Sequence, residues 1–407
     1  MTDLERYRKK YLEYLPEDGI RWLLIAESPP KQKEGGVPSF FYYDEDHVED
    51  VALMFKETMT ALFDPNWLET KWLDRKCVAD SKRKLLRRFS RRGFYLLDAL
   101  EERPIEKTRK ALRDTKTKDM LKVKIEGLVK EGFLSDKTQT VIVGKRVHQG
   151  LFEFLKNECC FENGKARLNI KNPEPVPLPN AYYWRDREEF RDYLRSLPKT
   201  EDVVRYALED FCLDFLESPY MCYTEHGMHA MFYRRLMNSL PNESLYTRVG
   251  GRDVCTVQKE YRMGSDVGKS RKAHWDIAVL EKSQSADAEN WYDYLRLNSV
   301  AEFGLNSDEG HFEDDVERLS HEQSGVPNCF IVNLYRYSRS LTGRDWQNEH
   351  EAFVSPVEMN NLIRKHGNKV VAYFALVDDT TGRRDGPYRI DGKSSPSRAP
   401  WDFHRSE

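Results

Sequence analysis

Four positions in the first half of the chain follow short apolar runs and carry groups suited to chemistry. Glu27 ends RWLLIAE, Asp98 ends FYLLD, Gly144 follows TVIV, and Asn180 ends the proline-rich run PVPLPN. In open α/β sheets, ligands bind at the carboxyl ends of the strands. The sequence therefore predicts a site built around these four positions and the loops that follow them.

Glu27 is the acid whose position points most directly to a reaction. Breaking a glycosidic bond builds positive charge on the sugar, and a nearby carboxylate stabilises that cation and orients a water. Glu27 follows five largely apolar residues, 22–26, and precedes a serine and two prolines that stiffen the backbone. The alternative is a surface acid at a strand end, with no part in chemistry.

The elements that must position these groups are strands alternating with helices. Strands are predicted over 21–28, 93–100, 140–146 and 175–181, and helices over 44–63, 118–134 and 147–158. This alternation indicates a parallel sheet covered on both faces. Residues 1–199 are therefore predicted to form one α/β domain.

Five motifs, in this order, resemble the uracil-DNA glycosylase superfamily over roughly residues 15–196: IAESPP, SFFYY, FYLLD, VIVGKRVHQGL and PLPNAYYW. The resemblance implies a three-layer fold around a parallel sheet and a DNA glycosylase activity. It implies catalytic roles for Glu27, which would position the attacking water, and for Asn180, in the motif whose loop stabilises the leaving base. It also implies that Asp98 reads the edge of the base.

Aromatic and basic residues complete the predicted DNA site. A base must leave the duplex to be attacked, and Phe40, Phe41 or Tyr42 would stack on it; one of the two phenylalanines is predicted to lie in the core and the other to face the pocket. Lys145 and Arg146 are predicted to bind DNA. Tyr182, Tyr183 and Trp184 form either a wedge that enters the base stack or a cover over the start of a helix.

Two positions depart from the pattern of uracil-selecting enzymes. Asp98 stands where those enzymes carry an amide, and Asn180 stands where many relatives have histidine. An ionised aspartate only accepts hydrogen bonds, so it favours a base that presents an amino donor, such as a cytosine-type edge. The predicted substrate is therefore a modified or amino-bearing base, and the alternative for Asp98 is a cap on the loop that follows.

The second half predicts another α/β domain, over residues 200–378. A linker and helix start cover 194–206, helices 223–240 and 310–321, and strands 272–281, 298–306 and 328–338. This order resembles the PD-(D/E)XK nuclease fold. The resemblance implies that Glu225, Asp276 and Glu302 bind Mg²⁺, which prefers hard oxygen ligands. The alternative is a chance placement of three acids in a chain that has 68.

The lysine of that nuclease pattern is missing from its usual place. It would stand two residues after the last acid, where this chain has Gly304. Either Lys269 or Lys272 supplies the charge from elsewhere, or the domain binds DNA without cutting it.

Composition limits the class and the partners. The formal net charge of −3 predicts no partner. Taken alone, each of the basic runs at 75–93 and 107–124 indicates a solvated helix face, but two such runs in the same half of the chain raise the odds that a phosphate backbone binds there. Seven cysteines with no C-x-x-C pair indicate reduced thiols in a cytoplasmic protein, without an iron–sulfur cluster or zinc finger. The N-terminus is too charged for a signal peptide, and no apolar run reaches membrane length. Residues 379–407 are predicted to be a flexible tail.

Together these features predict a DNA-acting protein that excises a base and binds or cuts DNA with its second domain. Such a pairing would fit DNA restriction or defence against phages with modified bases. No protein partner is predicted. The rivals are a metal-dependent nuclease whose first domain only recognises DNA, and a DNA-binding sensor without catalysis.

Overall fold

The computed structural model describes ten segments of the chain, and every structural statement below concerns them. They are residues 10–27, 41–42, 53–63, 75–100, 108–161, 166–179, 182–262, 274–284, 295–337 and 353–398. The chain divides into two compact units, Met1–Leu197 and Pro198–Glu407. The boundary predicted from the sequence falls after residue 199.

The N-terminal unit is built on a four-stranded parallel sheet in the order β2-β1-β3-β6. Its strands are β1 (Trp22–Ala26), β2 (Phe94–Asp98), β3 (Gln139–Ile142) and β6 (Asn169–Ile170). All five residues of β1 are buried, as expected for a central strand covered on both faces. The carboxyl ends of β1 and β2 lie in register, since Ala26 pairs with Asp98.

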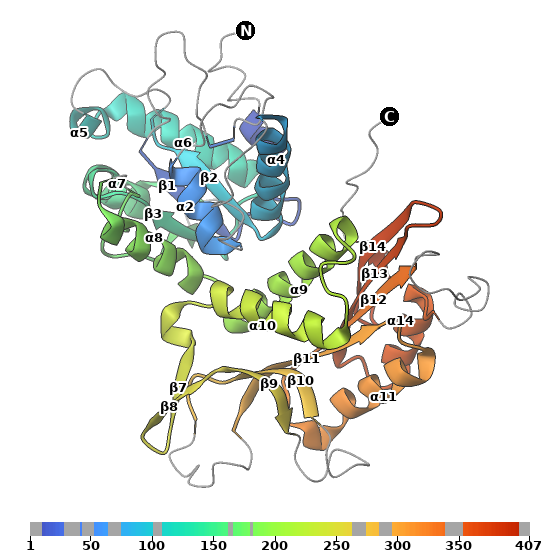
Figure 1. The fold of residues 1–407 in the computed structure, drawn as a ribbon. Coiled ribbons are helices and arrows are strands. Elements are labelled where there is room, and N and C mark those ends of the chain that lie inside the picture. Colours follow the sequence, from blue (N-terminus) through green and yellow to red (C-terminus); the bar gives the residue numbers. More distant parts are fainter. Residues whose placement is uncertain are drawn as a thin grey trace. The chain divides into compact units, whose positions relative to one another are not determined.

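Helices surround this sheet (Figure 1). They are α2 (Leu53–Leu62), α4 (Arg75–Arg91), α5 (Thr108–Ala111), α6 (Thr115–Lys130), α7 (Lys145–Glu158) and α8 (Trp184–Ser196). A two-stranded pair, β4 (Cys160–Phe161) and β5 (Ala166–Arg167), follows α7. Helix α7 buries Val147, Leu151, Phe154 and Leu155, the spacing of a single apolar face.

The strand predicted over 175–181 does not form within its described residues, 175–179, and for these the prediction is wrong. Pro175, Pro177 and Pro179 have no amide hydrogen to donate to a ladder, so only Val176 makes a bridge, to Val143. The fourth strand is instead β6, which comes earlier in the chain. The segment that carries the prolines runs on as an irregular loop.

The outer edge of β2 is covered by a side chain. The Tyr42 hydroxyl accepts a hydrogen bond from Leu96 N at 2.8 Å and lies 3.3 Å from Leu96 O, to which it donates. Unpaired backbone groups on a buried edge are costly, and this hydroxyl satisfies one donor and one acceptor. Complete burial raises the pKa of Tyr42 well above its usual value, and the nearby charge of Asp98 adds to the rise.

The C-terminal unit is built on a seven-stranded mixed sheet in the order β15-β14-β13-β12-β11-β10-β9. The strands are β9 (Val257–Arg262), β10 (His274–Leu280), β11 (Leu297–Leu305), β12 (Asn328–Tyr337), β13 (Val370–Asp378), β14 (Arg383–Ile390) and β15 (Ser397–Arg398). Strands β11, β12 and β13 run parallel, and the other neighbours are antiparallel. A separate hairpin joins β7 (Tyr246–Val249) and β8 (Arg252–Cys255).

Two hydrophobic cores lie on opposite faces of this sheet. Helices α9 (Thr200–Glu217) and α10 (Glu225–Ser239) pack with one set of strand side chains, including Phe303 and Val332. Helices α11 (Glu309–Ser320) and α14 (Pro356–Lys365) pack with the alternate set, including Val300 and Ile331 (Figure 1). Strand residues alternate between the faces, so each strand serves both cores.

The flexible tail predicted over 379–407 needs correction in its described part, 379–398, which contains two strands; residues 399–407 lie outside the described residues. Strand β14 pairs along β13, and Tyr388 and Arg389 of β14 pair with β15. The run is rich in glycine, serine and charge, which suggested looseness, but β14 lies near the end of the sheet, where its polar side chains can face solvent.

The predicted α/β class is confirmed at the level of a parallel four-stranded sheet and a further mixed sheet, both packed with helices. Within the described segments, no helix combines the length and the apolar composition needed to span a bilayer.

Candidate functional site

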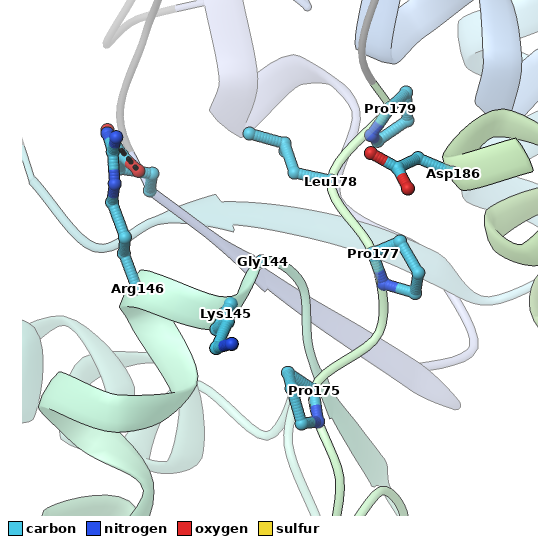
Figure 2. A pocket seen from close by; sticks show the side chains of 9 residues that line it. Gly144, Lys145, Arg146, Pro175, Pro177, Leu178, Pro179 and Asp186 are labelled. Carbon is cyan, nitrogen blue, oxygen red and sulfur yellow. Dashed lines mark ion pairs between the residues drawn. The ribbon is translucent and has the colours of Figure 1, made fainter. Parts of the chain in front are cut away.

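A pocket of about 470 Å³ opens at the carboxyl edge of the parallel sheet. It brings together the end of β1, the start of α7, the proline loop and the first turn of α8. Its lining residues are Glu27, Gly144, Lys145, Arg146, Pro175, Pro177, Leu178, Pro179 and Asp186. In Figure 2 the proline loop runs opposite the start of α7. This is the edge at which α/β sheets bind ligands.

Glu27 is part of the pocket wall. It follows the last residue of β1, and its side chain is 14% exposed. Its backbone oxygen accepts a hydrogen bond from Leu100 N at 2.9 Å, which holds the turn after β1 against the turn after β2. Arg146 Nη1 lies 4.0 Å from Glu27 Oε2. The carboxylate thus faces the pocket beside a cation and does not project into bulk solvent.

The start of α7, next to Glu27, makes one wall of the pocket positive. Gly144 has a φ of +94°, a conformation that side chains rarely adopt, and it turns the chain from β3 into α7. Lys145 and Arg146 form the exposed first turn of that helix. Backbone amides at a helix N-terminus carry partial positive charge, and two cationic side chains add to it. The pocket therefore combines two carboxylates, Glu27 and Asp186, with an anion-binding wall.

Asp98 and Phe41 lie near this edge but do not line the pocket. Asp98 ends β2 and is half-buried, close enough to Tyr42 to affect its pKa. Phe41 is 4% exposed and packs edge-on against Tyr42 and Phe55 in the core. Since Phe41 is buried, Phe40 is the one of the two phenylalanines that stays predicted to stack on the base.

Two predicted site residues, Phe40 and Asn180, lie outside the described residues. The aromatic wall expected beside Glu27 and the group expected to stabilise the leaving base therefore stay predictions. The described lining of the pocket contains no aromatic side chain.

Three consecutive aromatic residues stand beside the pocket, largely in solvent. Tyr182, Tyr183 and Trp184 are 90%, 62% and 66% exposed. They fall between two lining residues, Pro179 and Asp186, in the sequence. Since consecutive Cα atoms are about 3.8 Å apart, the Cα of Trp184 lies within about 8 Å of that of Asp186. Most of the surface of these side chains therefore faces solvent and does not cover the start of α8.

A second group of charged residues lies in the C-terminal unit, where β10 and β11 pair. Asp276 Oδ2 accepts a hydrogen bond from Phe303 N at 2.8 Å. The neighbouring Glu302 is 3% exposed, and its Oε1 has no hydrogen-bond partner among the described residues. Burial, together with the charges of Asp276 and Asp315, raises the pKa of Glu302 well above its usual value.

Helix α11 supplies the cation beside this pair. Arg318 Nη2 lies 3.9 Å from Glu302 Oε2 and also contacts Asp315 Oδ1. His311 Nε2 lies 3.4 Å from Asp315 Oδ2. Burial raises the pKa of Asp315, and the pKa of Arg318 rises because Glu302 and Asp315 outweigh its own burial. One guanidinium thus neutralises part of a buried acidic group.

Glu225 does not join the other two predicted metal ligands. It is the first residue of α10, and its Oε2 accepts a hydrogen bond from Leu305 N at 3.4 Å, beyond Glu302 on β11. Among the described residues, the one set of three ligand-type side chains within 4.8 Å of one another is His226, His229 and Glu260. The sequence analysis did not identify this set. The two histidines, three apart on a predicted helix, were the signal that could have found it.

Gly304, at the position of the family lysine, is packed too closely for any side chain. A Cβ there would overlap Ser307 Oγ and Asn333 Oδ1, and Asn333 pairs with Gly304 across the sheet.

We expect Gly304→Ala to lower the free energy of unfolding by about 1–3 kcal/mol, because a packed site must shift. Thermal unfolding of the full chain measures it. Gly310→Ala is the matched control, since its Cβ would meet nothing closer than Asp308 Oδ1 at 3.6 Å. Equal midpoints for the two variants would contradict the prediction.

Glu302→Gln is expected to stabilise the chain, and the gain should grow with pH. The raised pKa means that the folded state holds the Glu302 proton more tightly than the unfolded state does. Stability is therefore lost as pH rises above the ordinary glutamate value of about 4.3, and glutamine is free of this loss. We expect the melting-temperature difference to widen by about 2 °C or more between pH 4 and pH 8, since 1 kcal/mol shifts a domain of this size by about 2–4 °C.

The control for that experiment is Glu317→Gln, which removes an exposed acid from the same helix, α11. It should show no gain that depends on pH. A constant difference for Glu302→Gln across the range would mean that this carboxyl group titrates alike in the folded and unfolded chains.

Comparison of the chain with protein-family models, with curated proteins and with solved structures finds no match in any of the three.

Proposed function

We propose that the N-terminal unit is a DNA glycosylase that flips a base out of DNA and excises it, as its resemblance to the uracil-DNA glycosylase superfamily implies. The observation that carries this proposal is the position of Glu27. Its carboxylate lines a pocket of about 470 Å³ at the carboxyl edge of a parallel sheet, beside the cationic start of α7. A flipped nucleotide carries a sugar and a phosphate, and such a pocket offers a partner for each.

In the proposed reaction, Glu27 acts on the sugar. Charge develops on the sugar as the bond to the base breaks, and the carboxylate stabilises that charge. The same group accepts a hydrogen bond from a water and directs it at the sugar carbon. The water's oxygen joins the sugar, and the base leaves with a proton. The expected products are a free base and an abasic site.

The positive side of the pocket and the exposed aromatic residues would bind the DNA strand. Lys145, Arg146 and the amides at the start of α7 suit a phosphate, because a helix N-terminus attracts anions. Tyr182, Tyr183 and Trp184 suit the gap that an extruded base leaves in the stack. A wedge and a phosphate clamp on either side of one pocket would hold a nucleotide out of its helix.

The proposed substrate is a modified or amino-bearing base. Asp98 carries this part of the proposal, since an ionised aspartate accepts but does not donate hydrogen bonds. Asp98 stands at the carboxyl end of β2, in register with the residue before Glu27. Excision of such bases would fit restriction of foreign DNA, or defence against phages that carry them.

For the C-terminal unit we propose DNA binding with a PD-(D/E)XK-like fold, and strand cleavage as the second candidate function. The order α10, β9, β10, β11, α11, β12 supports the resemblance. Asp276 and Glu302 fit Mg²⁺, because Glu302 Oε1 is a buried acceptor without a hydrogen bond. When bound, Mg²⁺ would supply an activated water and a Lewis acid at the phosphodiester. Because residue 304 is a glycine, cleavage would need a cation from another position, such as Lys269 or Lys272. Both lie outside the described residues.

One experiment separates the candidates. Wild-type protein, Glu27→Gln and Asp276→Ala are incubated with DNAs that carry different modified bases, and released bases are identified by mass spectrometry while nicks are scored on gels. Base release that depends on Glu27 supports the glycosylase. Nicking that depends on Asp276, with no free base, supports the nuclease alone. Binding without either product supports a sensor and contradicts the proposed activity.

A further inference from the structure

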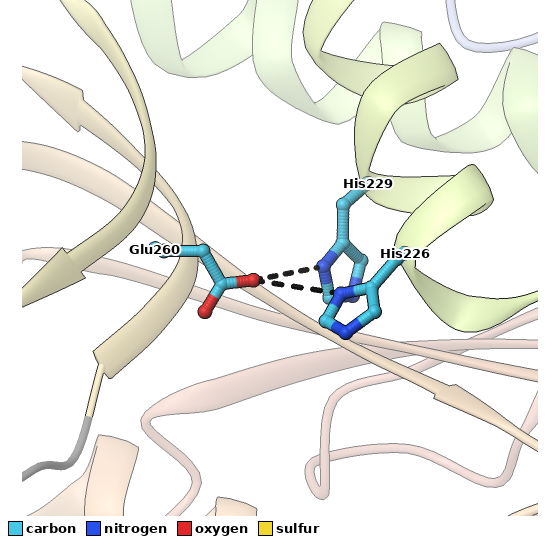
Figure 3. Close-up of side chains that lie close together, drawn as sticks. All are labelled: His226, His229 and Glu260. Atoms are coloured by element: carbon cyan, nitrogen blue, oxygen red, sulfur yellow. Dashed lines mark ion pairs between the residues drawn. The ribbon is translucent and has the colours of Figure 1, made fainter.

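Two histidines of α10 and one glutamate of β9 converge in the C-terminal unit. His229 Nδ1 lies 3.5 Å and His226 Nδ1 lies 3.8 Å from the same oxygen, Glu260 Oε1. Figure 3 shows both imidazoles turned toward this carboxylate, from one helix on one side and a strand on the other. A tetrahedral ion with ligands at 2.0–2.1 Å sets its ligand atoms about 3.3 Å apart. The three side chains therefore stand close to the spacing that such an ion needs.

His229 is the buried member of the set, and it lacks a hydrogen bond. Its side chain is 1% exposed, yet neither ring nitrogen has a hydrogen-bond partner among the described residues. Buried polar atoms are almost always satisfied, so an exception calls for an explanation such as an ion. The two nitrogens face different carboxylates: Nδ1 faces Glu260, and Nε2 lies 3.4 Å from Asp276 Oδ2.

The position of Asp276 is what a metal-bound histidine requires. A histidine that binds a metal through one nitrogen nearly always gives its other N–H to a carboxylate or a carbonyl, which fixes the ring and the tautomer. Asp276 is itself held by the amide of Phe303. The Phe303 ring also lies against His229, with centroids 5.5 Å apart. Asp276 and Phe303 thus contact the His229 ring on the side away from the proposed ion, and Nδ1 is directed at Glu260.

Glu260 is held in a strained backbone conformation. Its φ is +53°, although its neighbours Lys259 and Tyr261 both pair with β10. A residue other than glycine in this region costs of order 1–3 kcal/mol, and such strain persists where the surrounding structure requires it. Here it directs the carboxylate toward the imidazoles of α10.

We propose that His226, His229 and Glu260 bind one divalent ion of the zinc class. Two imidazoles and one carboxylate suit zinc and its neighbours in the first transition row, whereas Mg²⁺ prefers oxygen ligands. Three protein ligands leave a coordination position for water or substrate. That position is accessible, because the side chains of His226 and Glu260 are 79% and 46% exposed.

This site is separate from the Asp276–Glu302 pair, and its existence does not depend on the proposed glycosylase or nuclease activity. The two groups meet only at Asp276, which would orient His229 on one side and face Glu302 on the other. Binding of a zinc-class ion at His229 would therefore also affect the position and charge environment of Asp276, which contacts the other nitrogen of the ring.

The test measures metal binding directly, with no DNA present. Full-length protein is stripped of metal and titrated with Zn²⁺ against a chromophoric chelator, and Co²⁺ is then bound for its visible spectrum. We expect one ion per chain, with the spectrum of a nitrogen- and oxygen-coordinated site. His226→Ala and Glu260→Gln should each weaken binding at least tenfold. Asp276→Asn should weaken it about 10–100-fold, as loss of an outer-shell partner does.

The matched control is His366→Gln. This histidine also faces a single carboxylate, Glu313, at 3.5 Å, but no second imidazole of the described segments joins them. The His366→Gln variant should bind Zn²⁺ with the same affinity as the wild type. Burial raises the pKa of the Cys222 and Cys329 thiols to about 11 each, so neither is a ready thiolate that would compete for the ion. Equal affinity of the wild type, His226→Ala and Glu260→Gln would overturn the proposal, as would the absence of stoichiometric binding.

Discussion

Glu27→Gln is expected to lower the rate of base release about 10²–10⁴-fold, the range that a positioned acid or base contributes. Glutamine keeps the size of the side chain but removes the charge that would stabilise the sugar cation, and it replaces one of the two acceptor oxygens by an amino donor. Only 14% of the side chain is exposed, so bulk water screens the charge of this carboxylate only in part. The rate is measured as free base by mass spectrometry, with duplex binding measured alongside.

The control for this variant is Glu126→Gln, which neutralises an exposed acid on α6. Its rate should equal that of the wild type. The proposal also requires that Glu27→Gln still bind DNA, because the groups assigned to binding are unchanged. Base release at the wild-type rate by Glu27→Gln would refute the assigned role, whatever the identity of the base.

The double variant Tyr183→Ala/Trp184→Ala should lower affinity and base release about 5–150-fold, without loss of stability. Stacking of a base on an aromatic ring is worth about 1–3 kcal/mol, which corresponds to that range. The two side chains are 62% and 66% exposed, so the fold does not depend on their burial. Affinity is measured by fluorescence anisotropy on duplexes that carry the substrate base, and stability by thermal unfolding.

Tyr246→Ala is the matched control, since it removes a tyrosine that is 56% exposed on β7 of the other unit. It should change neither base release nor affinity beyond a factor of about two. A double variant that unfolds more easily but binds DNA normally would show that these rings support the fold and do not insert into DNA.

Sequence patterns predicted the features that depend on neighbouring residues in the chain, such as buried strands and the acids that follow them. Runs of buried residues predicted β1, β2 and β3, and again β10, β11 and β12, because a strand covered on both faces needs an apolar residue at nearly every position. The acids that end such runs could be located for the same reason. Glu27 was placed at the end of a strand before any tertiary contact was known.

Proline and tail segments show where local patterns mislead. The run 175–181 is apolar enough for a strand, but its prolines remove the donors that pairing needs, and its described part, 175–179, lines the pocket instead. The polar run 383–390 has a composition typical of a loose tail, yet it forms β14 because β13 offers it an edge. In both segments hydrogen-bond pairing decided the outcome, and composition does not report it.

What the sequence by itself determined, then, is the order of strands and helices and the acids at the strand ends. Only the tertiary structure decided which side chains meet. It set Arg146 beside Glu27, filled the space around Gly304 with Ser307 and Asn333, and brought Glu260 to two histidines about 30 residues earlier in the chain. The physical reason is that periodicity reports which face of an element is buried, whereas distances between elements follow from how whole faces pack.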